Sequence, residues 1–414
     1  MKEILEKLPF YNAAVLPYHF VQSLVAGTRY GFPGKKLRVI GVTGTNGKTT
    51  TCFMIWKMLN EAGHKAGLMT TVAWGVKELE PELNHMTTVD AVTLNKRIRK
   101  IAESNAEFLV LEVTSHAMAQ FRTLGIPVEI AVFTNLTHEH LDYHGTMDKY
   151  RDAKRKLFKK AKFGVINADD KAAIWFERSS SEYITYGVKK GQKRAEGVKM
   201  GVNGVKYSCG DIKIETRIPG EFNVYNSLAA VCVGERLGLS PEEIRRGIYA
   251  LEAVEGRMNT IDEGQDFVVI VDYAHAPDAI EKVFASVAGH SGKIIAVHGG
   301  AGRRDPSTRP VRGEILGREA DIVIITEDDS RDEDPMKIAA GFIEGAKKAG
   351  KIVDKDLFVE LDRKKAIKMA FDKAHKGDLV LILGKGHEKT ILRADGSHEF
   401  EDIKVARGLL RDRN

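Results

Sequence analysis

The chain has 414 residues, 43% hydrophobic and 29% charged, so it can bury the cores of two or three domains. Its 63 basic and 57 acidic residues are spread along the whole length, which argues against a nucleic-acid-binding footprint and favours small anionic substrates. Three cysteines without a CxxC spacing argue against disulfides or a structural zinc, and the interrupted apolar stretch near the N-terminus argues against a signal peptide or membrane span, so we expect a cytoplasmic protein.

Apolar runs typical of buried strands alternate with helical patterns along the chain. In the first half the strand runs lie at 37–44, 107–113 and 130–136, and the helical patterns at 49–63, 148–161 and 223–238. Short alternating stretches between 197 and 218 indicate small antiparallel strands. After Gly256 a second series of apolar runs begins, at 266–274, 293–302, 320–326, 355–361 and 378–386. The pattern predicts an α/β protein with two mostly parallel sheets and a boundary near Ala253–Gly256.

The stretch "VIGVTGTNGKTTT", residues 39–51, joins the first strand to the first helix through a glycine-rich turn. Such a turn directs backbone N–H groups at a phosphate, Lys48 reaches the terminal phosphates, and the Thr49 hydroxyl can ligate Mg²⁺. The strict Walker spacing is not met, because five residues separate Gly41 from Gly47. We interpret it as a variant phosphate loop that binds ATP, against the alternative of a tight turn with a solvated lysine.

Two further stretches carry polar residues at the ends of predicted strands. Glu112 ends the strand before "VTSHAMAQFR", where an acidic Mg²⁺ ligand or a helix cap is expected. The segment "THEHLDYHG" gathers three histidines and two acids without the HExxH spacing, namely His138, Glu139, His140, Asp142 and His144. Its composition leaves metal or phosphate contact and a solvated loop equally open.

The order of these motifs resembles the Mur ligases, ATP-dependent amide-bond formers of cell-wall precursor synthesis. The matching stretches are "GVTGTNGKTTT", "LEVTSH", "TNLTHEHLDYHGTMDKYRDAK", "GEFNVYNSLAA", "EGRM", "DYAHAPDA" and "GKGHE", and the similarity is greatest to the branch that adds the third amino acid. The resemblance implies a short N-terminal segment (1–37), a central P-loop-type ATPase domain (38–255) and a C-terminal Rossmann-like domain (256–414).

The resemblance also implies the reaction and its ATP site. A substrate carboxylate is phosphorylated by ATP, and an amine then attacks the acyl phosphate. The implied ATP contacts are Gly44, Thr45, Asn46, Gly47, Lys48, Thr49, Thr50, Asn223, Asn226, Arg257 and Asp272. Thr49, Glu112 and His140 match the Mg²⁺ ligands, and Lys154 matches a lysine that CO₂ carbamylates to a carboxylate able to assist them. Lys48, Glu112, His140 and Lys154 are the implied catalytic group.

Two substrate sites are implied in the same way. Thr87, Thr88, Thr114, Gln120 and Arg122 match contacts to the muramoyl peptide, part of a nucleotide-sugar peptide. Arg304, Asp329, Arg331, Gly384 and Glu388 match contacts to the incoming diamino acid. The segment "DDSR" replaces the "DNPR" of the members that use meso-diaminopimelate. Arg331 is kept and favours that substrate, whereas the additional carboxylate of Asp329 favours lysine.

The N-terminal segment is the largest departure from the family pattern. About 38 residues precede the phosphate loop, too few for a UDP-binding domain. The sequence leaves open a reduced platform, a different carrier, or a protein partner that supplies the missing contacts. We expect Leu16, Phe20, Val21, Leu24 and Val25 to pack on the central domain of a monomer without a membrane span.

Three other functions compete with this hypothesis. A folate polyglutamate ligase would share the ATP loop and the mechanism. A non-catalytic nucleotide-binding scaffold has no physical need for the complete set of metal-site residues. A nucleic-acid-stimulated ATPase is suggested by a sequence pI near 8.9, and an absence of salt-sensitive nucleic-acid binding would remove it.

Overall fold

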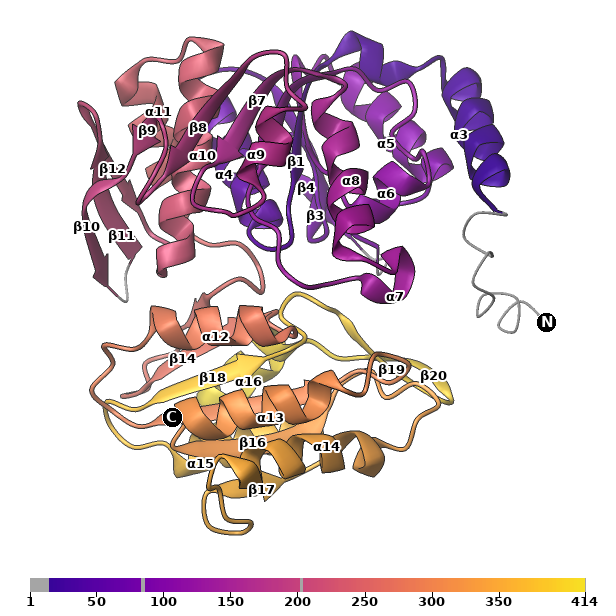
Figure 1. Cartoon of the computed structure of the whole chain (residues 1–414). Coiled ribbons are helices and arrows are strands. Elements are labelled where there is room, and N and C mark those ends of the chain that lie inside the picture. The colour runs from indigo at the N-terminus through magenta and orange to yellow at the C-terminus, as the bar shows by residue number, and fades with distance from the viewer. Residues whose placement is uncertain (1–14, 83–85, 202–203, 414) are drawn as a thin grey trace. The chain divides into compact units, whose positions relative to one another are not determined.

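The computed structural model describes residues 15–82, 86–201 and 204–413 (Figure 1). The chain forms two compact units. The first extends to Arg217 and takes in Glu221–Glu252, and the second comprises Ile218–Gly220 and the chain from Ala253 onward. Each unit contains a large, mostly parallel sheet with helices around it, which confirms the predicted α/β class.

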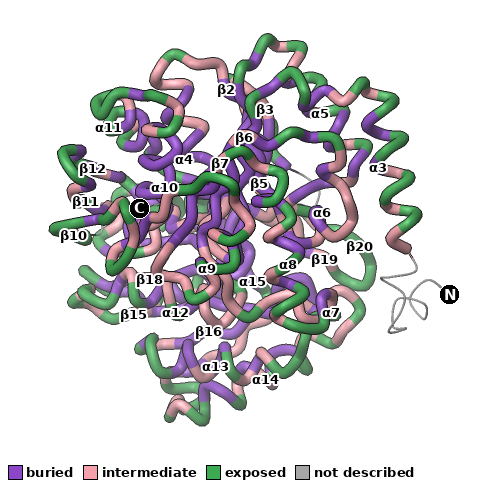
Figure 2. Tube along the Cα trace, turned by 45° about the horizontal axis from the view of Figure 1, so that its top comes forward, coloured by how far each residue is buried: buried purple, intermediate pink, exposed green. Residues whose placement is uncertain are grey.

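A nine-stranded sheet runs through the first unit in the order β4-β3-β2-β5-β1-β6-β7-β8-β9. Neighbouring strands from β2 to β9 are parallel, and β3 and β4 add an antiparallel edge. The central strands are buried along their length (Figure 2), as expected for parallel strands covered on both faces. The strands are β1 (Arg38–Thr43), β2 (Ala66–Met69), β3 (Ala73–Gly75), β4 (Leu79–Pro81), β5 (Phe108–Glu112), β6 (Val128–Phe133), β7 (Ala161–Asn167), β8 (Tyr183–Gly187) and β9 (Lys193–Arg194).

Helices connect these strands, and a small antiparallel sheet contacts the last two of the helices. The helices are α3 (Leu16–Tyr30), the short η1 (Pro33–Lys36), α4 (Lys48–Glu61), α5 (Ala91–Glu103), α6 (Ser115–Ala119), α7 (Leu141–His144), α8 (Met147–Phe158), α9 (Ala173–Glu177), α10 (Glu221–Leu237) and α11 (Pro241–Tyr249). The small sheet is formed by β10 (Glu196–Gly201), β11 (Gly204–Cys209) and β12 (Ile212–Thr216), as the glycine-rich stretches predicted.

The second unit contains a six-stranded sheet in the order β13-β14-β18-β15-β16-β17. Its strands are parallel apart from the edge strand β13. The elements are β13 (Asn259–Ile261), β14 (Val268–Asp272), α12 (Pro277–Ser286), β15 (Ile294–Gly300), α13 (Thr308–Glu319), β16 (Ile322–Glu327), α14 (Pro335–Lys348), β17 (Leu357–Val359), α15 (Arg363–Lys373), β18 (Leu379–Leu383), the hairpin β19 (Thr390–Arg393) and β20 (Gly396–Glu399), and α16 (Asp402–Arg411).

Helix α3 corrects one prediction about packing. Phe20, Val21, Leu24 and Val25 were expected to pack on the central domain, yet each is exposed, and the helix buries Ser23, Ala26 and Gly27 instead. The face with small residues is the buried one because it lets the helix backbone approach the neighbouring chain closely. A Cβ on Gly27 would lie 2.4 Å from the ring of Phe32, so a larger side chain does not fit there.

Arg363, at the start of α15, is fully buried and joins four elements of the second unit. Its guanidinium donates to both carboxylate oxygens of Asp402 at 2.7 Å, to the Leu383 carbonyl at 3.0 Å and to the Glu327 carbonyl at 3.3 Å. We expect Arg363→Met to lower the free energy of unfolding by about 3–5 kcal/mol, because it leaves the buried Asp402 carboxylate unpaired. Urea titration measures this loss, and the surface variant Arg318→Met is the control, for which a loss below about 1 kcal/mol is expected. An equal loss in both variants would contradict the assigned role.

Candidate functional site

The phosphate loop lies at the carboxyl edge of the first sheet, directly after its central strand β1. Glu112 ends β5 on one side of β1, and Thr134 follows β6 on the other. The loop after β1 therefore leaves the sheet between β5 and β6, two strands that come later in the chain. Ligands bind in open α/β sheets at such a switch point.

Two glycines and the segment after β6 shape the loop. Gly44 and Gly47 have φ values of +155° and +81°, and a Cβ on either would clash, at 1.9 Å from Thr134 Oγ1 and at 2.4 Å from Asn226 Oδ1. The Thr45 amide donates to the Asn135 carbonyl at 2.8 Å, which ties the loop to the neighbouring strand end. The loop is thus fixed in position before a ligand arrives, as a phosphate-binding turn requires.

The residues of the loop occupy distinct positions at the start of α4. Lys48 begins the helix, and its ammonium donates to the Thr45 carbonyl at 2.7 Å. Asn46 is held by its amide, which donates to Asn135 Oδ1 at 2.9 Å. Thr49 and Thr50 are buried in the first turn. The helix N-terminus and the Lys48 ammonium together favour an anion here.

Glu112 is the centre of a small oxygen-rich cluster. Its Oε2 accepts from Thr49 Oγ1 at 3.0 Å, from the Thr71 amide at 3.0 Å and from Thr71 Oγ1 at 3.1 Å. The structure therefore brings together Thr49 and Glu112, two of the three predicted Mg²⁺ ligands. Hydroxyl and carboxylate oxygens are the donors that Mg²⁺ prefers, so this part of the site fits the ion.

His140 and Lys154 lie in the same unit, in the connection between β6 and β7. His140 precedes α7 in a left-handed conformation (φ 56°), with its ring centroid 5.9 Å from that of Tyr150. Lys154 is buried. Its Nζ donates to the Gly44 carbonyl at 2.6 Å and lies 4.6 Å from the centre of the Tyr150 ring. Burial, together with the charge of Lys48, holds the pKa of Lys154 well below its usual value. A neutral amine is the form that reacts with CO₂.

The predicted adenine contacts Asn223 and Asn226 lie in α10 and are both buried. Asn226 Nδ2 donates to Asn223 Oδ1 at 2.9 Å, while Asn226 Oδ1 accepts from Thr51 Oγ1 at 3.2 Å. The pair thereby connects α10 to the helix that follows the phosphate loop. Its position beside Gly47 is compatible with a nucleotide contact, which stays a prediction.

Four of the five predicted peptide contacts form one hydrogen-bonded network. Thr88 Oγ1 donates to the Glu112 carbonyl at 3.0 Å and accepts from Thr114 Oγ1 at 3.2 Å. The guanidinium of Arg122 donates to the Thr88 carbonyl and, at 2.5 and 3.0 Å, to Gln120 Oε1. This network continues directly from the Glu112 cluster, so these residues lie next to the candidate metal site.

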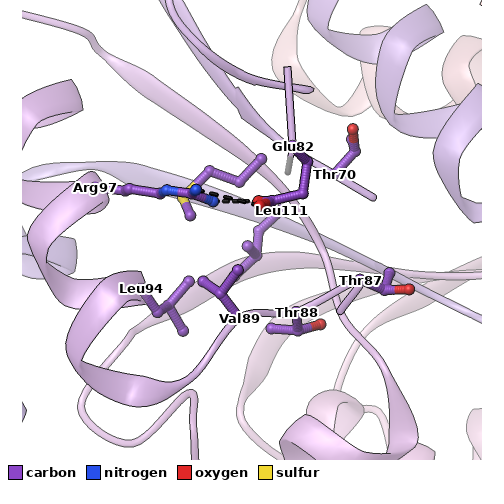
Figure 3. Close-up of a pocket in the computed structure, with 9 residues that line it drawn as sticks. Thr70, Glu82, Thr87, Thr88, Val89, Leu94, Arg97 and Leu111 are labelled. Carbon is purple, nitrogen blue, oxygen red and sulfur yellow. Dashed lines mark hydrogen bonds and ion pairs between the residues drawn. The ribbon is translucent and has the colours of Figure 1, made fainter. Parts of the chain in front are cut away.

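Thr87, the fifth of these residues, lines a small pocket together with Thr88 (Figure 3). The opposite wall carries Arg97, which forms an ion pair with the buried Glu82. The Arg97 guanidinium also lies 4.6 Å from the centre of the Trp74 ring. This pair joins the residue that follows β4 to helix α5.

The predicted nucleotide contacts of the second unit lie near the end of β14. Asp272 is buried and accepts from the amides of Met258 and Ala274, each at 2.7 Å. Burial raises the pKa of Asp272, and the Arg257 charge opposes that shift. Arg257 lies over the ring of Tyr273, at 4.5 Å from its centre. Both Asp272 oxygens thus fix the local turn, a structural role that the sequence motif did not reveal.

The predicted amino-acid contacts of the second unit are only partly brought together. Asp329 and Glu388 meet at a buried lysine, Lys385, whose ammonium donates to them at 2.9 and 2.7 Å. Gly384 adjoins this lysine in a left-handed conformation (φ +111°). Arg304 is exposed and Arg331 half-buried, and within the described residues neither side chain is paired with the carboxylates around Lys385.

Lys385, Thr71 and Tyr150 are site residues that sequence reasoning did not assign. Lys385 stands between two glycines directly after the buried run of β18, and that position after an apolar strand was the available signal. Thr71 had no such signal, because it reaches Glu112 from a loop 41 residues earlier. Tyr150 sits on a basic helix, and only folding brings its hydroxyl to 3.1 Å from Thr45 Oγ1.

The carboxyl group of Glu388 is expected to make the free energy of unfolding depend on pH. Burial and the Asp328 carboxylate raise its pKa from 4.5 to about 7, although Lys385 opposes the shift. The folded chain therefore binds this proton more tightly, and the resulting stability is present below about pH 4.5 and lost as the pH rises through about 7. The free energy of unfolding of the wild type minus that of Glu388→Gln is expected to fall between about pH 5 and pH 8. Urea titrations at a series of pH values measure this difference. The exposed control Glu344→Gln should give a difference that does not change with pH. A difference for Glu388→Gln that rises with pH would contradict the predicted direction.

Comparisons with known proteins place this geometry in context. Residues 42–234 match the Mur ligase middle domain and residues 256–386 match the Mur ligase, glutamate ligase domain. The UDP-N-acetylmuramoyl-L-alanyl-D-glutamate--2,6-diaminopimelate ligase of Geobacillus kaustophilus is 38% identical over 408 residues, covering 94% of this chain and 82% of that protein.

Two solved structures are similar as well. A UDP-N-acetylmuramoyl-L-alanyl-D-glutamate--2,6-diaminopimelate ligase matches with a TM-score of 0.64 and 33% identity, over 91% of this chain and 79% of that one. Folylpolyglutamate synthase of Mycobacterium tuberculosis, complexed with ADP and AMPPCP, matches with a TM-score of 0.72 and 16% identity, over 95% and 94% of the two chains, which shows the fold alone. Among the described residues, none of the helices has the length and apolar composition needed to cross a bilayer.

Proposed function

The chain belongs to the Mur ligase family, and we propose that it is an ATP-dependent ligase that adds the third amino acid to UDP-N-acetylmuramoyl-L-alanyl-D-glutamate in peptidoglycan precursor synthesis. Meso-diaminopimelate is the favoured amino acid and lysine the second candidate. The observation that carries the proposal is the 38% identity to a diaminopimelate ligase over 94% of the chain. The buried network from Thr49 to Arg122 supplies matching chemistry.

The reaction has two steps. The γ-phosphoryl group of ATP moves to the carboxylate oxygen of the peptide and ADP leaves; the amine nitrogen then bonds to the acyl carbon, loses a proton and expels inorganic phosphate. Lys48 and the N-terminus of α4 bind the anionic phosphates, and Arg122 orients the carboxylate substrate. Such phosphoryl transfer depends on positioning and on neutralising charge, which are the tasks these groups perform.

The residues that would hold Mg²⁺ are Thr49, Glu112 and His140, with Lys154 as a carbamate. The ion neutralises charge on the transferring phosphoryl group when it is bound. The carbamate would place a negative group next to the loop, and the lowered pKa and the burial of the Lys154 amine support the modification. Asn223, Asn226, Arg257 and Asp272 are proposed to complete nucleotide binding.

Arg331 is proposed to bind the distal carboxylate of diaminopimelate, together with Arg304, while Glu388 accepts from an ammonium group. We expect Arg331→Ala to lower kcat/KM for diaminopimelate by about 100-fold, because a charge-assisted contact to a carboxylate is lost, and to lower that for lysine less than about threefold. Coupled ADP release with each amino acid measures both. Arg411→Ala, a surface arginine paired with Glu263, is the control. Equal losses for both amino acids would refute the assigned contact.

The function itself is tested by phosphate release from ATP and Mg²⁺ with UDP-N-acetylmuramoyl-L-alanyl-D-glutamate. The acceptors are meso-diaminopimelate, lysine and ornithine, compared side by side, with mass spectrometry of the product. Release coupled to a tripeptide product is the expected result. No release with any of the three acceptors would refute the proposed substrates.

A further inference from the structure

Lys385 is a buried cation that faces three neighbouring carboxylates of the second unit, two of them buried and that of Glu388 half-buried. Its ammonium is fully buried and donates to Asp328 Oδ1 at 3.2 Å, Asp329 Oδ1 at 2.9 Å and Glu388 Oε2 at 2.7 Å. Carboxylate oxygens of the three acids lie within 4.8 Å of one another. Acids this close repel one another when they are ionised, and the chain itself supplies a cation that opposes this repulsion.

The carboxylate of Asp329 is therefore already paired within the chain. One of its oxygens accepts both from Lys385 and, at 3.1 Å, from the amide of Leu392 in β19. The carbonyl of Leu392 in turn accepts from the Arg331 amide at 2.8 Å, and Arg331 holds a left-handed conformation with φ 56°. A continuous chain of contacts thus runs from the Lys385 ammonium to the backbone of Arg331.

We propose that Lys385 is a positioning residue that determines which amino acid the ligase accepts: it neutralises Asp329 and holds the segment that presents Arg331. This inference rests on the proposed function. With Lys385 present, the carboxylate of Asp329 neither repels the distal carboxylate of diaminopimelate nor attracts the side-chain ammonium of lysine. Without it, the same carboxylate does both.

The reasoning makes Asp329 and Lys385 dependent on each other. In Asp329→Asn the side-chain amide oxygen still accepts from Lys385 and Leu392, so the segment that carries Arg331 keeps its position. The variant loses only a negative charge that Lys385 had offset. In Lys385→Met most of the apolar stem is kept, but Asp329 loses its cation, as Asp328 and Glu388 also do. Adding Asp329→Asn to Lys385→Met removes the charge of Asp329. A direct selecting role for Asp329 predicts a different pattern, since its single variant would then alter the preference.

The test compares kcat/KM for diaminopimelate and for lysine in the wild type, Asp329→Asn, Lys385→Met and the double variant, with Lys385→Arg as the variant that conserves the charge. The expected ratio of the two constants changes less than threefold in Asp329→Asn and in Lys385→Arg. It falls at least tenfold towards lysine in Lys385→Met and recovers at least threefold towards diaminopimelate in the double variant, which differs from Lys385→Met only in the charge of Asp329. Thermal unfolding of each variant shows whether it is folded.

Two results overturn the inference. One is a tenfold or larger change of the ratio in Asp329→Asn alone, which would mean that Asp329 contacts the substrate directly and which decides the matter even if Lys385→Met does not fold. The other is an equal loss for both amino acids in a folded Lys385→Met, which would mean a purely structural lysine. A wild type that ligates neither amino acid refutes the proposed function instead, and the inference with it.

Discussion

Replacing Lys48 by alanine is expected to lower kcat for ADP formation by about 10³-fold or more. Lys48 begins α4 directly after the glycine turn, and its ammonium already lies 2.7 Å from a loop carbonyl, where it is available to the terminal phosphates. Removing a charge that stabilises a transferring phosphoryl group costs several powers of ten in rate. The loss appears mainly in kcat, because the interaction strengthens as charge moves to the leaving oxygens.

Steady-state ADP release with saturating peptide and amino acid measures this effect. Lys57→Ala is the matched control, since Lys57 lies on the same helix and pairs with Glu61 at the surface. The control should retain activity within about twofold. A Lys48→Ala variant that kept more than a tenth of wild-type kcat would show that the loop does not hold the reacting phosphates.

Replacing Lys154 by methionine is expected to reduce ligation by a similarly large factor, about 10³-fold, while leaving the fold intact. Methionine fills the buried space of Lys154 but cannot form a carbamate, so the site keeps its packing and loses a negative group beside the proposed metal ligands. We expect the fold to tolerate the change because methionine keeps most of the apolar packing and burial already disfavours the charged form of the Lys154 amine.

Three measurements separate this effect from misfolding. Thermal unfolding should show a stable variant, native mass spectrometry of the wild type should show a mass gain of one CO₂ that acidification removes, and bicarbonate should restore wild-type activity lost at acidic pH. Lys149→Met, an exposed lysine on the same helix, is the control and should remain active. Full activity of Lys154→Met would eliminate the carbamate from the mechanism.

The fold followed from the sequence because its signals are local. The runs that became β1, β5 and β6 are continuous and apolar, and the glycine turn at 44–47 joins a strand to a helix within one short motif. The face that α3 buries could not be read in this way. Its apolar residues suggested one face, but close packing against Phe32 depends on the absence of a side chain at Gly27.

The site was predictable only where its residues share a motif. Thr49 and Lys48 lie in one stretch, whereas Thr71 and Glu112 meet from separate loops and strands. The charge attributed to Asp329 shows the same limit. A sequence shows that a carboxylate is present, but its partner Lys385 lies 56 residues away and follows β18, which β15 separates from β16 in the sheet, so only the folded chain brings the two together.

The position of the phosphate loop between β5 and β6 has a consequence for the folding of the chain. The strands that border the loop are adjacent to β1 in space but lie about 65 to 95 residues further along the sequence. A partly folded chain therefore has no complete nucleotide site, so ATP recognises the finished sheet alone. Because ATP binds the folded chain and not the unfolded one, cellular ATP raises the folded fraction by mass action. It thus stabilises the protein as well as serving as its substrate.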